Sequence, residues 1–92
     1  MSRLDEYRAE IAEIDEKIIT LIAERNAVAR KIGKEKQQLG MPVIVPDVEE
    51  KVEKRYKKSA ENHGVSEGTA SVIARAVIDE AVAVQQETSS KH

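Results

Sequence analysis

The sequence contains no cysteine, no tryptophan and no phenylalanine, and two tyrosines are the only aromatic residues among its 92. Without cysteine the chain has no disulfides, no thiol nucleophile and no Cys-based metal site. Its two histidines, His63 and His92, are too few for a His-rich metal centre, so we expect no metal site. The interior has to be built from Ile, Leu, Val and Ala, and these residues suit packed helices.

Neither sign of charge dominates the chain. Its 15 basic and 17 acidic residues give a net charge of -2, and the two signs are interleaved. A basic surface for nucleic acid is therefore not expected. No apolar run approaches the roughly 20 residues that span a bilayer, and the first ten residues lack a signal-peptide core. We expect a cytoplasmic protein that binds neither nucleic acid nor membrane.

A heptad repeat runs through the first 39 residues. Its two apolar series are occupied by Leu4, Ile11, Ile18, Ile32 and Leu39, and by Tyr7, Ile14, Leu21 and Val28. This pattern predicts one long helix with an apolar seam. Such a helix is about 54 Å long, too long for the remainder of the chain to cover. The seam therefore predicts a homodimer in which two such helices pack together.

The remainder of the chain predicts two more helices and no second domain. Pro46 suits the first position of a helix, Gly64 suits a left-handed cap after its end, and Ser66 suits the cap of the last helix. The fold class is therefore all-α, with three helices per subunit in a single domain, 1–92. Its expected parts are a helix at about 3–39, a loop at 40–45, helices at about 46–62 and 66–87, and a polar tail at 88–92.

One charge interrupts the apolar seam. Arg25 is the only polar member of the series that begins at Leu4, and an unpaired buried charge costs several kcal/mol, in rough terms. Lys36 projects from nearly the same helical face, about 16 Å further along the axis. Two inward cations suggest an anionic ligand. Arg8 lies about 26 Å before Arg25, so it can join the same small site only from a partner subunit.

Each polar residue also has a purely structural interpretation. Arg8 and Lys36 fall where solvated charges commonly flank a coiled coil. Arg25 could set the register by pairing with Glu24 or with a glutamate of the partner. Gln85 could be a surface or interhelical hydrogen-bonding residue, and Glu49 could complement the helix dipole.

Taken together, the spacing of these polar residues resembles the all-helical class of chorismate mutases. The blocks YRAEIAEIDEKIITLIAERNAVA and IGKEK carry most of the resemblance, which extends from Leu4 to about Gln86. It implies an intertwined homodimer with two active sites to which both chains contribute. It also implies conversion of chorismate to prephenate without a cofactor or metal.

The resemblance assigns roles residue by residue. Arg25 and Arg8 of the partner subunit match the positions that bind the two substrate carboxylates. Lys36 and Gln85 match the pair that hydrogen-bonds the ether oxygen, and Glu49 matches the acidic residue near the substrate hydroxyl. A rearrangement of this kind transfers no proton and uses no nucleophile, so a site made of charge and shape suits it.

Three positions depart from the family pattern. Val45, Val48 and Ala81 stand where an Asp, an Arg and a small hydroxyl residue are common. We expect them to line the pocket and to weaken substrate binding. Isochorismate-pyruvate lyase is an alternative on the same fold, although Glu49 favours the mutase. A non-catalytic helical module for dimerisation or regulation is the other alternative.

Overall fold

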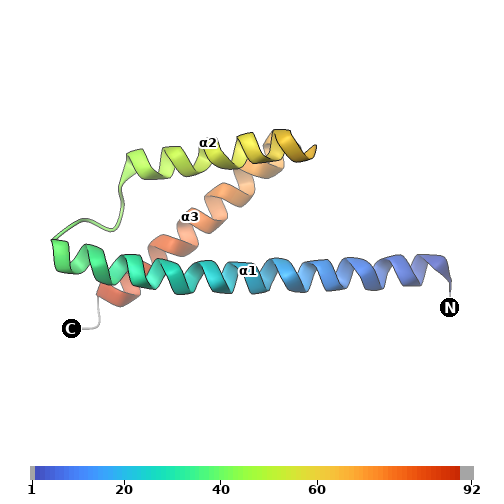
Figure 1. The fold of residues 1–92 in the computed structure, drawn as a ribbon, viewed down its shortest axis with the longest axis horizontal. Helices are drawn as coiled ribbons and strands as arrows, with labels where there is room; N and C mark the ends of the chain where they lie inside the picture. The colour runs from blue at the N-terminus through green and yellow to red at the C-terminus, as the bar shows by residue number, and fades with distance from the viewer. Residues whose placement is uncertain (1, 90–92) are drawn as a thin grey trace.

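Three helices make up the protein in the computed structural model, which describes residues 2–89 and their side chains to residue 87. They are α1 (Arg3–Leu39), α2 (Pro46–His63) and α3 (Glu67–Ser89), and the described residues contain no strand. The predicted all-α class with three helices is confirmed (Figure 1). The intertwined homodimer stays a prediction.

Local capping interactions determine where α1 begins and where α1 and α2 end. The Ser2 hydroxyl accepts a hydrogen bond from the Asp5 backbone N–H at 3.1 Å, which satisfies one free donor of the first turn. Gly40 and Gly64 follow the last helical residues with φ of 68° and 70°. Only glycine adopts this left-handed conformation without steric cost, so both helices stop there.

The second and third helices differ slightly from the predicted bounds. The second begins at Pro46, whose ring lacks the N–H that a first helical residue would leave unpaired, and it ends at His63 instead of residue 62. Ser66 caps α3 by accepting from the Thr69 N–H at 3.2 Å. That helix extends to Ser89 because no glycine or proline follows Gly68 in it, so the polar tail predicted at 88–92 begins two residues too early. Residues 90–92 lie outside the described part.

The third helix holds the fold together. It starts beside the end of α2 and runs back across the last turns of α1, so it packs against both, while the backbones of α1 and α2 stay apart (Figure 1). Its small apolar side chains dominate the core, which among the described residues consists of Ala29, Ala60, Ala70, Ala74, Val77, Ile78 and Val84. The N-terminal half of α1 extends beyond this core.

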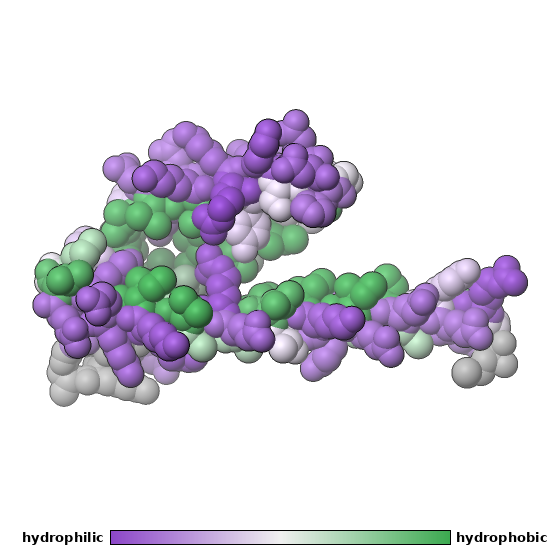
Figure 2. All heavy atoms as spheres, viewed as in Figure 1, coloured by the Kyte–Doolittle hydropathy of each residue, from purple (hydrophilic) through white to green (hydrophobic). Residues whose placement is uncertain are grey.

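The apolar seam of α1 is exposed within one subunit. In Figure 2 it forms a band along the part of α1 that neither other helix reaches. Its members are 45% to 63% exposed, and they are Leu4, Tyr7, Ile11, Ile14, Ile18, Leu21, Val28, Ile32 and Leu39. The accessible surface totals 7122 Å² for 10.2 kDa, whereas about 5,300 Å² is typical of a folded monomer of this mass. None of the described helices is long and apolar enough to cross a membrane.

Gly33 allows α1 to pass close to α3. This glycine is buried, and a Cβ added to it would lie 3.1 Å from Gln85 Cα and 3.3 Å from Gln85 Cβ. Those atoms belong to a helix and cannot swing aside as the end of a flexible side chain would. Gly33 therefore sets the spacing at which Gln85 faces α1.

Replacing Gly33 tests this spacing. Alanine gains up to about 1 kcal/mol of helix propensity over glycine. In Gly33→Ala we expect overpacking against Gln85 to exceed that gain, with a net loss of about 1 kcal/mol in the free energy of unfolding. Gly68→Ala is the matched control, because its Cβ meets nothing within 4 Å, and it should be neutral or stabilising. Urea unfolding followed by circular dichroism compares them, and equal stabilisation by both would contradict the prediction.

Candidate functional site

A cavity of about 480 Å³ lies between the last turns of α1, the loop after it, the first half of α2 and the end of α3. Most of its wall is aliphatic, and its polar groups are few and convergent, as in small-molecule sites. Seven of the eight residues that the sequence singles out line it: Arg25, Lys36, Val45, Val48, Glu49, Ala81 and Gln85. The eighth, Arg8, is exposed on the N-terminal part of α1 and lies outside this cavity.

Lys36 links three segments at one end of the cavity. Its Nζ donates to the Val43 backbone oxygen at 2.7 Å and to Gln85 Oε1 at 2.8 Å. Gln85 is 6% exposed, and it is the one buried polar or charged side chain among the described residues. The ammonium therefore joins the last turn of α1 to both the loop and α3.

This hydrogen bond also orients the Gln85 amide. An ammonium only donates, so the amide oxygen faces Lys36 and the amide N–H groups point elsewhere. Lys36 has three N–H donors and uses two of them here, which leaves one. The pair thus offers two kinds of fixed donor, an ammonium N–H and an amide N–H, at the cavity wall.

Burial affects the charge of Lys36. Partial removal from water lowers the pKa of its ammonium below that of an ordinary lysine, and the negative charge of Glu49 opposes this by raising the pKa. Glu49 thus helps to keep Lys36 protonated. The two residues come from different helices and line the same cavity.

Arg25 is half-buried and has a partner that the sequence did not reveal. Its Nη1 donates to the backbone oxygen of Val77 on α3 at 3.1 Å. The structure gives no ion pair between Arg25 and Glu24, so the suggested register pairing within the chain is replaced by a carbonyl contact with α3. One N–H group is used in this way, and a guanidinium has five, so the others remain to bind an anion.

Glu49 is held from outside the cavity by Arg75, a residue that the sequence analysis did not single out. Arg75 Nη2 lies 3.4 Å from Glu49 Oε1, and the same guanidinium contacts Glu53 at 3.3 Å and Asp79 at 2.9 Å. The i, i+4 spacing of Arg75 and Asp79 is a signal that the sequence contains. The contacts of Arg75 with Glu49 and Glu53 on α2 depend on the tertiary fold.

The α2 side of the cavity is largely aliphatic, as the sequence predicts. Val48 and Val52 line it beside Glu49, and Val45, the residue that caps α2, provides no side-chain acceptor. Arg55 lines the same side and was not singled out. Its spacing from Val48 and Val52, at i+7 and i+3, is the signal that would have placed it on this face.

A second hollow of similar volume, about 490 Å³, lies at the other end of α2. Lysines line it, but Lys54 is paired with Glu50 at 3.0 Å and Lys57 lies 3.8 Å from Glu67. All the residues that line this second hollow are exposed to solvent. The first cavity has the buried, convergent donors, and it is the better candidate site.

The protein is small and all-helical, and its largely aliphatic cavity, with an ammonium, two guanidinium groups, an amide and one carboxylate, suits an organic anion. Comparison with known proteins narrows this class. The sequence profile of the chorismate mutase type II family matches residues 7–86. The chain belongs to that family, and the resemblance inferred from the sequence is confirmed.

Individual relatives agree with this assignment. A chorismate mutase from Methanocaldococcus jannaschii is 36% identical over the whole of this chain and 97% of its own length. The bifunctional chorismate mutase/prephenate dehydratase of Aquifex aeolicus is 38% identical over 70% of this chain, and the T-protein of Haemophilus influenzae is 33% identical over 72%. Each match covers only 18% of those two longer proteins.

The electrostatic coupling between Lys36 and Glu49 can be measured directly. We expect nuclear magnetic resonance titration of the Lys36 side chain to give a pKa below the usual lysine range. Glu49→Gln should lower that pKa further, because it removes the one negative charge that raises it. An unchanged or higher pKa in Glu49→Gln would show that the two groups are not coupled.

Proposed function

We propose that this protein is a chorismate mutase, an isomerase that rearranges chorismate to prephenate, and that Lys36 and Gln85 stabilise the transition state. The observation that carries the proposal is the hydrogen-bonded Lys36 and Gln85 pair, which faces the same cavity as Arg25 and Glu49. Membership of the family and the 36% identity to a chorismate mutase over the full chain support it.

The Lys36 and Gln85 pair can stabilise the charge that develops as the C–O bond breaks. In this [3,3] rearrangement the C–O bond lengthens before the new C–C bond is complete, so negative charge develops on the ether oxygen. The remaining Lys36 N–H and the Gln85 amide N–H are donors for that oxygen. Donors held in place before the reaction lower the barrier, since no reorganisation is needed as the charge appears.

Arg25 suits the binding of a substrate carboxylate. Its contact with Val77 fixes the guanidinium against α3, and the other N–H groups remain for a charge-assisted, two-point hydrogen bond. Holding the carboxylate keeps the enolpyruvyl arm folded over the ring. That removes entropy which would otherwise be lost on the way to the transition state.

Glu49 would accept a hydrogen bond from the substrate hydroxyl. Arg75, which lies outside the cavity, contacts one oxygen of this carboxylate and so helps to fix its orientation. Its negative charge also helps to keep Lys36 protonated. One carboxylate would therefore both bind the substrate and maintain the ammonium that the reaction needs.

A homodimer with shared sites completes the proposal. The exposed seam of α1 and a surface about 1,800 Å² larger than that of a typical monomer of this mass support burial against a second copy. The Cα radius of gyration of 16.6 Å, against about 12 Å for a compact chain of this length, has the same implication. Arg8 lies on that seam-bearing half of α1, and we propose that it enters the site of the partner subunit.

Other expectations from the sequence stay predictions. They are the cytoplasmic location, the weaker substrate binding caused by Val45, Val48 and Ala81, and a reaction that needs no cofactor. No feature of the cavity favours isochorismate-pyruvate lyase activity over mutase activity, so the assay tests both substrates.

The first experiment incubates the purified protein with chorismate, follows its loss by ultraviolet absorbance and identifies the product by chromatography. We expect prephenate. Arg25→Ala and Lys36→Ala should each lower kcat/KM at least about 100-fold, the usual effect of removing one charge-stabilising donor, while helical content is retained. Lys31→Ala, an exposed lysine of α1 outside the cavity, is the matched control and should retain activity.

Two outcomes would reject the assignment. Pyruvate and salicylate formed from isochorismate, with no prephenate from chorismate, would make the protein a lyase. No turnover of either substrate would leave a helical dimer without catalysis. Substantial activity in Lys36→Ala would instead reject only the role of Lys36 at the ether oxygen.

Mixing two inactive variants tests the contribution of Arg8 in trans. An Arg8→Ala subunit paired with a Lys36→Ala subunit has one site with both defects and one with neither. We expect separately inactive variants to regain activity on subunit exchange, with about a quarter of all sites intact in a statistical mixture of dimers. Differently tagged subunits allow the heterodimer to be purified and verified. Inactive heterodimers would show that Arg8 acts within its own chain or not at all.

A further inference from the structure

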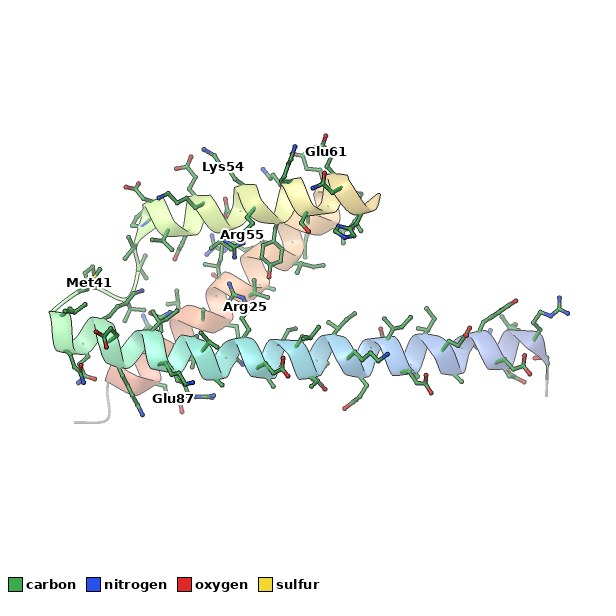
Figure 3. All side chains as sticks on the ribbon, in the orientation of Figure 1. Arg25, Met41, Lys54, Arg55, Glu61 and Glu87 are labelled. Carbon is green, nitrogen blue, oxygen red and sulfur yellow. The ribbon has the colours of Figure 1, made fainter. Side chains whose placement is uncertain are left out.

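Arg55 lines the cavity, and none of the roles proposed for the conversion of chorismate to prephenate uses it. It is the one cationic side chain that α2 contributes to the wall, beside Val48, Glu49 and Val52. In Figure 3 its side chain points from α2 toward α1, and that of Arg25 points from α1 toward it. Two guanidinium groups from different helices thus face each other across one cavity.

Arg55 also lacks the carboxylate partners that neighbouring cations have. Of its four neighbours on the helix surface, Lys51 and Lys58 carry the same charge, and the other two are uncharged. By contrast, Lys54 on the same helix pairs with Glu50 at 3.0 Å. Within the described part of the chain, Arg55 forms no hydrogen bond or ion pair.

Arg55 is exposed to solvent, and with Arg25 it gives the cavity two guanidinium groups that would both attract an anion placed between them. The arginine fork binds a carboxylate through two parallel hydrogen bonds, and two forks converging on one carboxylate satisfy all its acceptor positions. Apart from the two arginines, Lys36, Glu49 and Gln85, the cavity wall is aliphatic.

We propose that Arg55 is a substrate-binding residue, which holds the same carboxylate of chorismate as Arg25 from the opposite wall. The inference rests on the proposed function and adds to it a third arginine, supplied by the same chain as Arg25. A carboxylate keeps its charge throughout the rearrangement, so this contact acts alike on the bound substrate and on the transition state. Its loss therefore raises KM more than it lowers kcat.

The test compares Arg55→Ala with Lys51→Ala. Both remove one positive charge from α2, one turn apart, so the change in the overall electric field is nearly the same, but Lys51 is exposed and outside the cavity. We expect Arg55→Ala to raise KM for chorismate and Kd for prephenate about tenfold or more, as for a lost charge-assisted hydrogen bond. Lys51→Ala should change either by less than about twofold. Arg55→Lys, which keeps the charge but not the fork, should fall between the two.

Steady-state kinetics give the KM and kcat values, and titration calorimetry with prephenate gives binding independently of turnover. If the unmodified protein is active and Arg55→Ala behaves like Lys51→Ala, the inference is wrong while the proposed function stands. If the unmodified protein neither turns over chorismate nor binds prephenate, both are wrong. Circular dichroism checks the fold of each variant, and Arg55→Lys gives a second comparison should Arg55→Ala fail to fold.

Discussion

The hydrogen bond from Lys36 to Gln85 is the contact on which the cavity depends. It joins the last turn of α1 to α3, and the bond from the same ammonium to Val43 ties down the loop before α2. Gly33 allows the approach, because no side chain separates it from the Gln85 backbone. Gly33, which has no side chain, and Lys36, which has a charged one, thus together place the loop, α1 and α3 around one pocket.

The side chains that line this cavity carry more positive than negative charge. Arg25, Lys36 and Arg55 line it with Glu49 as the one carboxylate, while an aliphatic surface separates them. Partial burial already lowers the pKa of Lys36, so adding cations without an anion would weaken its protonation further. The proposed dianionic substrate would relieve this imbalance, and the relief of repulsion between the cations would contribute to its binding.

Sequence reasoning predicted what depends on local patterns. The heptad predicted the long α1, and Gly64 predicted the end of α2, because period and cap chemistry act over a few residues. Arg25 was found as an exception to the apolar pattern, and Lys36 was found because it projects from nearly the same helical face. The carbonyl of Val77 and the contact between Arg75 and Glu49 were not found, because they join residues 52 and 26 positions apart and depend on how α3 crosses the other helices.

In the proposed homodimer, the uncovered half of α1 would tie the stability of this protein to its own concentration. A helix whose apolar face has no cover within the chain gains its burial free energy only on meeting another molecule, so unfolding and dissociation become one process. The midpoint of thermal unfolding then rises with protein concentration, and dilution removes folded molecules as well as assembled ones. In such a dimer, the amount of protein present would help to determine what fraction of it is folded.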